Sequence, residues 1–459
     1  MGSFKLSSEV FVIVLSILLL SVAATSTDFA FAHHKEGHDN GPGEENGNSG
    51  NNGNSGNNKD KKNEKTDKEK YGEKSKNNLL GKIQKDKEKK IEVIDFIKPI
   101  KNKDKKTDSK ITKFIQSKDY QTYAKKKGFD YYEGNTRLII NVNEISNDVL
   151  NKIKEIATIE ITKGNQMQIS MPVHEISKIS NISEIKNIRS TFLAIQNRDI
   201  VVDGRIIEDS IFAKNVISST PVSIAIIDLA FNEKNQKISD NVIESVSFRY
   251  LYENSDSLKI DNSESFHGTA MAQIIISMLP DVKLHLLSAG TELEFIDAMD
   301  YAISKNVDII TISYTWVNYV TDGTSSITKK VEDAIKSEIT VVVPSGNYAE
   351  NHWEGIFRDT DGDRWHEFSN ADEGLTIQVD GKRVYEEKPI LVYLKWSDDE
   401  NIISDFDLTL MDASGKIVDY SSTLQEKDSS KLEYIHYIPE VPGEYYIGIS
   451  NFGQQQWPI

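Results

Sequence analysis

Residues 266–272 read Phe-His-Gly-Thr-Ala-Met-Ala, and this stretch decides how the rest of the chain is interpreted. Apolar residues then recur at i, i+3, i+4 and i+7, namely at Met271, Ile274, Ile275 and Met278. This spacing predicts an amphipathic helix with His267 at its start. A histidine at such a position is a candidate catalytic residue, although a motif this short also arises by chance.

Two predicted strands, one before and one after this histidine in the chain, each lead into a candidate polar residue. The apolar run 222–227 ends at Asp228, and the run 340–344 leads into Ser-Gly-Asn347. Further strands and helices alternate between them, with strands at 282–288 and 308–313 and helices at 294–304 and 327–337. This alternation predicts βαβ units, a parallel sheet and a functional site at the carboxyl ends of the strands.

A smaller pattern precedes this region and an all-β pattern follows it. Residues 135–200 alternate strand and helix in the order β-α-β-α-β, which suggests a ferredoxin-like α/β domain. Residues 370–459 contain six short strands separated by Asp, Ser, Gly and Pro, which predict a β-sandwich. The protein is therefore expected to be an α/β protein with a small domain before its core, at 215–355, and a sandwich after it.

Charge and cysteine content exclude several classes of function. The chain of 459 residues has a formal net charge of −17, with +7 on residues 1–200 and −24 on the remainder. An acidic second half argues against nucleic acid as a partner, because phosphate neutralisation requires clustered Lys and Arg. The absence of cysteine excludes disulfides, thiol nucleophiles and thiolate metal sites.

The N-terminus has the pattern of an export signal. Lys5 precedes an apolar run, and Ala-Phe-Ala at 30–32 offers a cleavage site, so residues 1–32 are predicted to be a signal peptide. The protein is then secreted or displayed at the cell surface, with no membrane contact after cleavage; an uncleaved anchor is the alternative. Residues 33–130, rich in Lys, Asn and Gly, are predicted to be a disordered spacer, with short helices possible from residue 79.

The order Asp228, His267 in His-Gly-Thr-x-x-Ala, and Asn347 in Pro-Ser-Gly-Asn resembles a subtilisin-like serine protease of the subtilase (peptidase S8) family. The resemblance implies a three-layer αβα core in which His267 is the general base, Asp228 orients it and Asn347 stabilises the oxyanion. It also implies that residues 135–200 are a propeptide, acting as intramolecular inhibitor or chaperone. Taken singly, a strand-terminal Asp and a Gly-Asn turn are both common.

The segment Ser313-Tyr314-Thr315 resembles the family's substrate-binding Ser-x-Gly strand, with Thr315 in place of the usual glycine. The family's nucleophile motif, Gly-Thr-Ser-x-Ala, has no match after Asn347. Ser325 follows Gly-Thr but precedes Asn347, so it does not fit the family's order. Either the chain is truncated before the catalytic serine, with the sandwich inserted between the Asn and Ser motifs, or it is a degenerate relative.

An acidic loop follows the core. Asp359, Asp361 and Asp363 alternate with other residues at the spacing of a calcium loop, but the glycine is displaced from its EF-hand position. Calcium is a possible ligand, a solvated turn is the alternative, and no cofactor is required. His352 and His366 flank the loop and are interpreted as surface or packing residues.

We therefore expect a secreted serine endopeptidase that hydrolyses peptide bonds in polypeptide substrates through an Asp-His-Ser triad. The chain as given would then be inactive, because its nucleophile is missing. The alternative is a catalytically dead, secreted binding protein that presents its β-sandwich to peptide or polysaccharide. Cleavage specificity and the propeptide processing site do not follow from the sequence.

Overall fold

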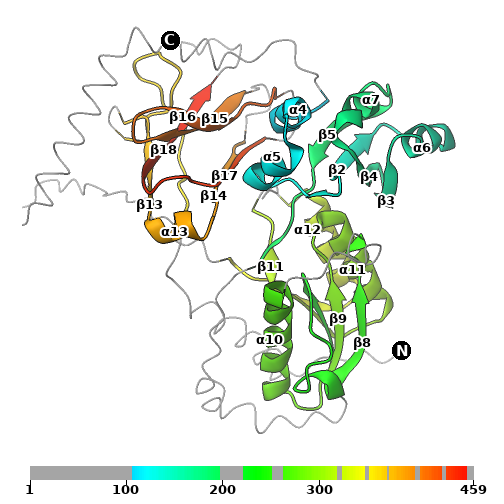
Figure 1. Ribbon diagram of the computed structural model, residues 1–459. Helices are drawn as coiled ribbons and strands as arrows, with labels where there is room; N and C mark the ends of the chain where they lie inside the picture. The colour runs from blue at the N-terminus through cyan, green and yellow to red at the C-terminus, as the bar shows by residue number, and fades with distance from the viewer. Residues whose placement is uncertain are drawn as a thin grey trace, which may run out of the picture. The chain divides into compact units, whose positions relative to one another are not determined.

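The computed structural model describes residues 106–196, 221–250, 262–317, 323–346, 351–369, 372–397, 404–425 and 431–451 (Figure 1). The predicted signal peptide and most of the predicted spacer lie outside these ranges. No helix in the described ranges has the length and apolar character needed to cross a membrane.

The central region is built on a five-stranded parallel sheet. Its strands are β7 (Ser223–Asp228), β8 (Val242–Ser247), β9 (Lys283–Ser288), β10 (Ile309–Ile312) and β12 (Thr340–Val342), in the order β12-β10-β7-β9-β8. All four pairings are parallel. The predicted parallel sheet is therefore confirmed. The sequence pattern did not predict β8, in which Glu244, Ser245 and Ser247 interrupt the apolar run.

Both faces of this sheet are covered by helices. Along β7, Ile224 and Ile226 join a core with α10 (Asn262–Met278), whereas Ala225 and Ile227 join a second core. That second core contains residues of α11 (Glu292–Ser304) and α12 (Ser326–Lys336). Because successive side chains of a strand point to opposite faces, the continuous apolar run of β7 serves both cores. The central region is thus a three-layer α/β fold.

Helix α10 begins earlier than the sequence pattern predicts. Its backbone is helical from Asn262, so His267 lies inside the helix and not at its start. Of the predicted apolar stripe, Met271, Ile275 and Met278 are buried and Ile274 is half-buried. The pattern located the buried face, but it missed the first turn because that turn contains only polar residues.

The region before the core has the strand order of a ferredoxin-like fold. Its main strands are β2 (Asn135–Val142), β3 (Thr158–Lys163), β4 (Gln166–Pro172) and β5 (Ile185–Ser190), preceded by the short β1 (Tyr131–Tyr132). Strand β2 pairs antiparallel with β4 and β5, and β3 pairs with β4. The helices are α6 (Asn147–Lys154) and α7 (Ile176–Ser180), the latter preceded by the 3₁₀ helix η1 (Val173–Glu175). The predicted β-α-β-α-β order lacked strand β3. We call residues 130–190 the small domain.

Two helices precede the small domain, inside the range predicted to be disordered. They are α4 (Ser109–Gln116) and α5 (Tyr120–Lys127). Phe114 of α4 is fully buried and packs on Phe129 with ring centroids 4.4 Å apart. The described residues 106–130 therefore do not form a disordered spacer, and they contain short helices as expected, because spaced apolar residues allow this lysine-rich segment to bury one face. We call residues 109–127 the helical hairpin.

The C-terminal region consists of antiparallel sheets, as expected. One sheet has the order β13-β18-β15-β16, and the other pairs β14 with β17. The strands are β13 (Leu375–Val379), β14 (Ile390–Lys395), β15 (Phe406–Asp412), β16 (Ile417–Ser421), β17 (Leu432–Tyr437) and β18 (Gly443–Asn451). Leu408, Leu410 and Ile435 lie in a core common to both sheets. The short helix α13 (Gly381–Tyr385) was not predicted.

Candidate active site

A buried carboxylate and a buried imidazole meet at the carboxyl end of β7. The Nδ1 atom of His267 lies 2.6 Å from Oδ2 of Asp228, and the two residues are 6% and 0% exposed. The other oxygen, Oδ1, accepts a hydrogen bond of 2.7 Å from the amide of Leu229. The carboxylate is an acceptor, so this contact places the proton of a neutral imidazole on Nδ1 and leaves the lone pair on Nε2.

The residues after His267 explain how α10 can approach β7 so closely. A Cβ atom on Gly268 would lie 2.4 Å from the carbonyl oxygen of Ala230, in the loop that follows Asp228. The next residue, Thr269, accepts a hydrogen bond of 2.8 Å from the amide of Asn232. The His-Gly-Thr sequence therefore joins the helix that contains His267 to the loop that follows Asp228.

Ser313 makes a contact that the sequence did not suggest. Its hydroxyl donates a hydrogen bond of 2.5 Å to Oδ2 of Asp228, the same oxygen that faces His267. The sequence assigned Ser313 only to substrate binding, whereas its side chain supports the Asp228–His267 pair.

The predicted substrate-binding segment continues as strand β11 (Tyr314–Thr315). This strand pairs antiparallel with β6 (Ile195–Gln196), the segment that follows the small domain. Tyr314 is 1% exposed, and its burial, with the charges of Asp228 and Glu294, holds the pKa of its hydroxyl well above the usual value. The side chain of Tyr314 is thus part of the core, and the backbone of β11 makes the strand pairing.

Asn347 and Ser325 were also candidate site residues in the sequence. Asn347 lies outside the described residues; its neighbour Gly346 is described and has a φ of +83°. Ser325 is the N-cap of α12, where its hydroxyl oxygen accepts a hydrogen bond of 3.0 Å from the amide of Thr328. A capping role accounts for Ser325 without any catalytic function.

The acidic loop is stabilised by its own backbone. The Asp359 carboxylate accepts hydrogen bonds from the amides of Gly362 and Arg364, at 2.7 and 3.0 Å. Carboxylate oxygens of Asp359, Asp361 and Asp363 lie within 4.8 Å of one another. The nearby His366 is 2% exposed and packs against Trp353 and Phe368, which agrees with the predicted packing role.

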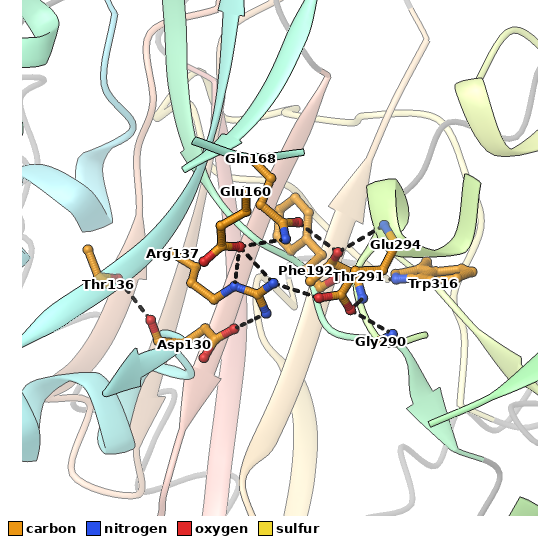
Figure 2. Close-up of polar contacts among 10 residues, drawn as sticks. All are labelled: Asp130, Thr136, Arg137, Glu160, Gln168, Phe192, Gly290, Thr291, Glu294 and Trp316. Carbon is orange, nitrogen blue, oxygen red and sulfur yellow. Dashed lines mark hydrogen bonds and ion pairs between the residues drawn. The ribbon is translucent and has the colours of Figure 1, made fainter. Parts of the chain in front are cut away.

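The small domain contacts the N-terminus of α11 through a buried ionic network (Figure 2). The guanidinium of Arg137, on β2, lies 2.6 Å from Glu294 of α11 and 2.8 Å from Glu160 of β3. It also lies 3.1 Å from Asp130. Burial alone would lower the pKa of Arg137, but the three carboxylates raise it. Burial likewise opposes ionisation of Glu294, and Arg137 nevertheless lowers the pKa of that carboxyl.

The same network includes the N-cap of α11. The hydroxyl of Thr291 donates to Gln168 of the small domain at 2.7 Å, and Glu294 accepts from the amides of Gly290 and Thr291. Next to it, the Trp316 indole donates to the carbonyl of Phe192 (Figure 2). Thr291 and Glu294 have the Thr-x-x-Glu spacing of a capping box, whereas no local sequence pattern marks Arg137 as the partner of Glu294.

A parallel α/β sheet with a buried Asp–His pair at its strand ends defines a site of the kind found in hydrolases that use a histidine base. Residues 219–382 match the model of the subtilase family, Peptidase S8. The matched segment covers less than half of the chain and includes the described parts of the Asp228–His267 site. No curated protein sequence matched the chain.

Solved structures of serine proteases are also similar. The epidermin leader peptide processing serine protease of Staphylococcus aureus is 16% identical with a TM-score of 0.32, over 46% of this chain and 59% of that one. The CspB protease of Clostridium perfringens is 10% identical with a TM-score of 0.25, over 51% and 61% respectively. The chain thus spans about three fifths of the length of these proteins.

Proposed function

We propose that this protein is a secreted, subtilisin-like serine endopeptidase. The observation that carries the proposal is the buried 2.6 Å contact between Asp228 and Nδ1 of His267, within the segment that matches the subtilase family. Polypeptides are its substrates. The pattern of residues 1–32 supports secretion.

Each residue of the site has a role that follows from its chemistry. Asp228 holds the imidazole with its Nδ1 proton toward the carboxylate, so that Nε2 accepts the proton of a serine hydroxyl. As the serine attacks the peptide carbonyl, Asp228 stabilises the imidazolium, which then protonates the leaving amine. Asn347 donates its side-chain amide to the oxyanion, a contact worth about 3 to 4 kcal/mol of activation free energy.

The nucleophile is proposed to lie in sequence that follows residue 459. Two observations support this: Ser325 caps a helix, and the buried Asp228–His267 contact leaves Nε2 of the imidazole to accept the proton of a hydroxyl. The alternative is a catalytically inactive relative that binds peptide or polysaccharide.

The small domain is proposed to inhibit the protease core from within the same chain. Strand β6, which follows the small domain, pairs with β11, the strand assigned to substrate binding. A substrate that adds as a strand needs the same backbone groups. The Arg137–Glu294 ion pair and the Thr291–Gln168 hydrogen bond hold the small domain on α11, and they support this arrangement.

Calcium is a further proposed ligand, at the loop of Asp359, Asp361 and Asp363. Carboxylate oxygens are the ligands that Ca²⁺ prefers, and these three converge on one loop. The ion would stabilise this loop and has no proposed part in the reaction. Removing the charge with Asp361→Asn should abolish any rise in melting temperature that calcium produces.

The proposed activity is tested with a chain extended by its downstream coding sequence. A Gly-Thr-Ser-x-Ala motif there, with hydrolysis of a peptide library, supports the protease. Asp228→Asn should then lower kcat about 10⁴-fold, as it does in other triads, because the wrong imidazole tautomer is stabilised. Asp281→Asn, at an exposed turn, is the matched control.

Labelling by a fluorophosphonate provides a second readout. The 459-residue chain should not react, whereas the extended chain should. A coding sequence that stops after Ile459 in an intact gene would contradict the protease and favour the inactive relative. If the 459-residue chain is labelled, Ser325→Ala reports whether Ser325 or another serine reacts.

A further inference from the structure

The helical hairpin makes a second interface, separate from the contacts on α11. Lys127, at the end of α5, lies 2.9 Å from Asp419 of β16 in the C-terminal sheets. These side chains are only 16% and 5% exposed. Removing one partner of such a pair costs more than breaking a surface ion pair, because it leaves a buried charge without its counter-charge.

Two further lysines lie over aromatic rings of the C-terminal sheets. Nζ of Lys110 lies 3.7 Å from the ring centroid of Tyr434, and Nζ of Lys113 lies 3.0 Å from that of Tyr420. Lys110 is 2% exposed, and its burial lowers the pKa of the ammonium to about 8 although the charge of Asp419 raises it. Among the residues that the structure describes, its Nζ has no hydrogen-bond partner, and the ring face of Tyr434 provides a cation–π contact.

The end of the hairpin also fits closely against β17. Gly128, the left-handed C-cap of α5 with a φ of +71°, faces the imidazole of His436. A Cβ atom at Gly128 would lie 2.7 Å from Cδ2 of that ring. Nδ1 of His436 lies 3.1 Å from the carbonyl oxygen of Lys126. Glycine is therefore required at this position for both its backbone conformation and its proximity to β17.

The charges on the two sides are complementary at the rim as well. Lys125 pairs with Glu387 at 2.6 Å, and Lys126 pairs with Glu440 at 2.9 Å. All four side chains are at least half exposed, so these pairs orient the hairpin more than they increase its binding affinity. The buried centre, with Lys127, Lys110 and their partners, would carry most of the binding.

We propose that the surface formed by β16 and β17 is a second docking surface for the propeptide, specific for the basic helical hairpin. The proposal rests on the proposed role of the small domain as a propeptide. A ligand held at two connected sites dissociates far more slowly than one held at either site. The C-terminal sheets therefore retain the inhibitory domain after the connecting chain has been cut, and they select this propeptide over one without the hairpin.

The test uses the full chain with a recognition sequence for a site-specific protease inserted between residues 197 and 220. After cleavage by the added protease, the dissociation rate of the fluorescently labelled N-terminal fragment is measured against an excess of unlabelled fragment. Lys127→Ala should raise this rate at least about 10-fold, because it leaves the Asp419 carboxylate buried without its cation. Lys154→Ala, at an exposed position of α6, is the matched control and should not change the rate.

Asp419→Asn tests the same pair from the other side with an isosteric change. Its effect combined with Lys127→Ala should be smaller than the product of the two single effects, because both remove one interaction. The circular dichroism of the uncut variants shows whether they fold. Equal rates for Lys127→Ala and Lys154→Ala overturn the proposal, as does a fragment that stays bound regardless of any substitution. The measurement needs no hydrolysis by this protein, so it can succeed or fail independently of the proposed protease activity.

Discussion

The two surfaces that hold the N-terminal region of this protein use different cations. At α11, the planar guanidinium of Arg137 contacts Glu294 of the helix together with Asp130 and Glu160 of the small domain. On the C-terminal sheets, Lys110 and Lys113 lie over tyrosine rings, and Lys127 pairs with one carboxylate. Arginine presents five donors in a fixed plane and is always charged, whereas lysine presents a point charge whose pKa falls on burial. Binding at the first surface should therefore depend more on the geometry of its partner, and binding at the second should depend more on pH.

The largest effect is expected for Arg137→Met. This change leaves Glu160 and Glu294 buried without their cation, and it should lower the free energy of unfolding by about 3 to 5 kcal/mol. Denaturant titration measures the loss. Arg137→Lys should recover only part of it, because one ammonium cannot reproduce the contacts to three carboxylates. Full recovery by lysine would show that charge alone is needed and would remove the contrast between the two surfaces.

The second prediction concerns Glu433, buried on β17 beside the hairpin. Burial raises the pKa of this carboxyl to about 7, although hydrogen bonds from Ser421, Thr423 and Gln425 lower it. The folded pKa thus exceeds the unfolded value, so the stabilisation is complete below about pH 4.5 and is lost as the pH rises to about 7. The loss amounts to about 3 kcal/mol.

Glu433→Gln should remove this pH dependence from denaturant unfolding curves measured between about pH 4.5 and 7. The amide oxygen can still accept from Thr423 and Gln425, whereas the amide nitrogen is a donor and would face the Ser421 hydroxyl. If the free energy of unfolding of the glutamine variant keeps the same pH dependence, another group is responsible for it.

A smaller effect is expected when the Lys127–Asp419 pair is broken in the uncut chain. Lys127→Ala should lower the free energy of unfolding by about 2 kcal/mol, because it leaves the largely buried Asp419 carboxylate without its cation. Replacement of Lys154, which is exposed on α6, provides the baseline. A loss as large as that of Arg137→Met would mean that the two surfaces contribute equally.

The smallest effect is expected at the rim of the second surface. Lys125→Ala and Lys126→Ala should leave the unfolding midpoint unchanged within error, because exposed ion pairs are screened by water and salt. Differential scanning calorimetry at low and high salt measures both. A salt-dependent fall in the midpoint for either variant would place part of the stability at the rim.

Local sequence patterns predicted most elements of this fold. The apolar run ending at Asp228 predicted β7, and the helical spacing from Met271 predicted the buried face of α10. The expected contact between Asp228 and His267 is present, while their catalytic roles stay predictions. Each of these expectations depends on residues that are close in the chain or on the parallel arrangement of neighbouring strands.

The features that the sequence did not predict depend on contacts between distant segments. Arg137, Glu160 and Glu294 are far apart in the chain, and each alone looks like a surface residue. Strand β8 contains polar residues at an edge of the sheet, where no apolar run is needed. Short helices were expected in the lysine-rich segment of the helical hairpin, but lysines usually indicate a solvated segment, so it was assigned to the spacer. Burial of these lysines requires a partner surface that only the folded chain provides.

The close approach at Gly268 limits which sequences can form the candidate site. A side chain there would press on the carbonyl oxygen of Ala230 and separate α10 from the loop after β7. The 2.6 Å contact of His267 with Asp228 would then lengthen, although neither residue had changed. Loss of the site in a related sequence can therefore begin at a residue that has no chemistry of its own.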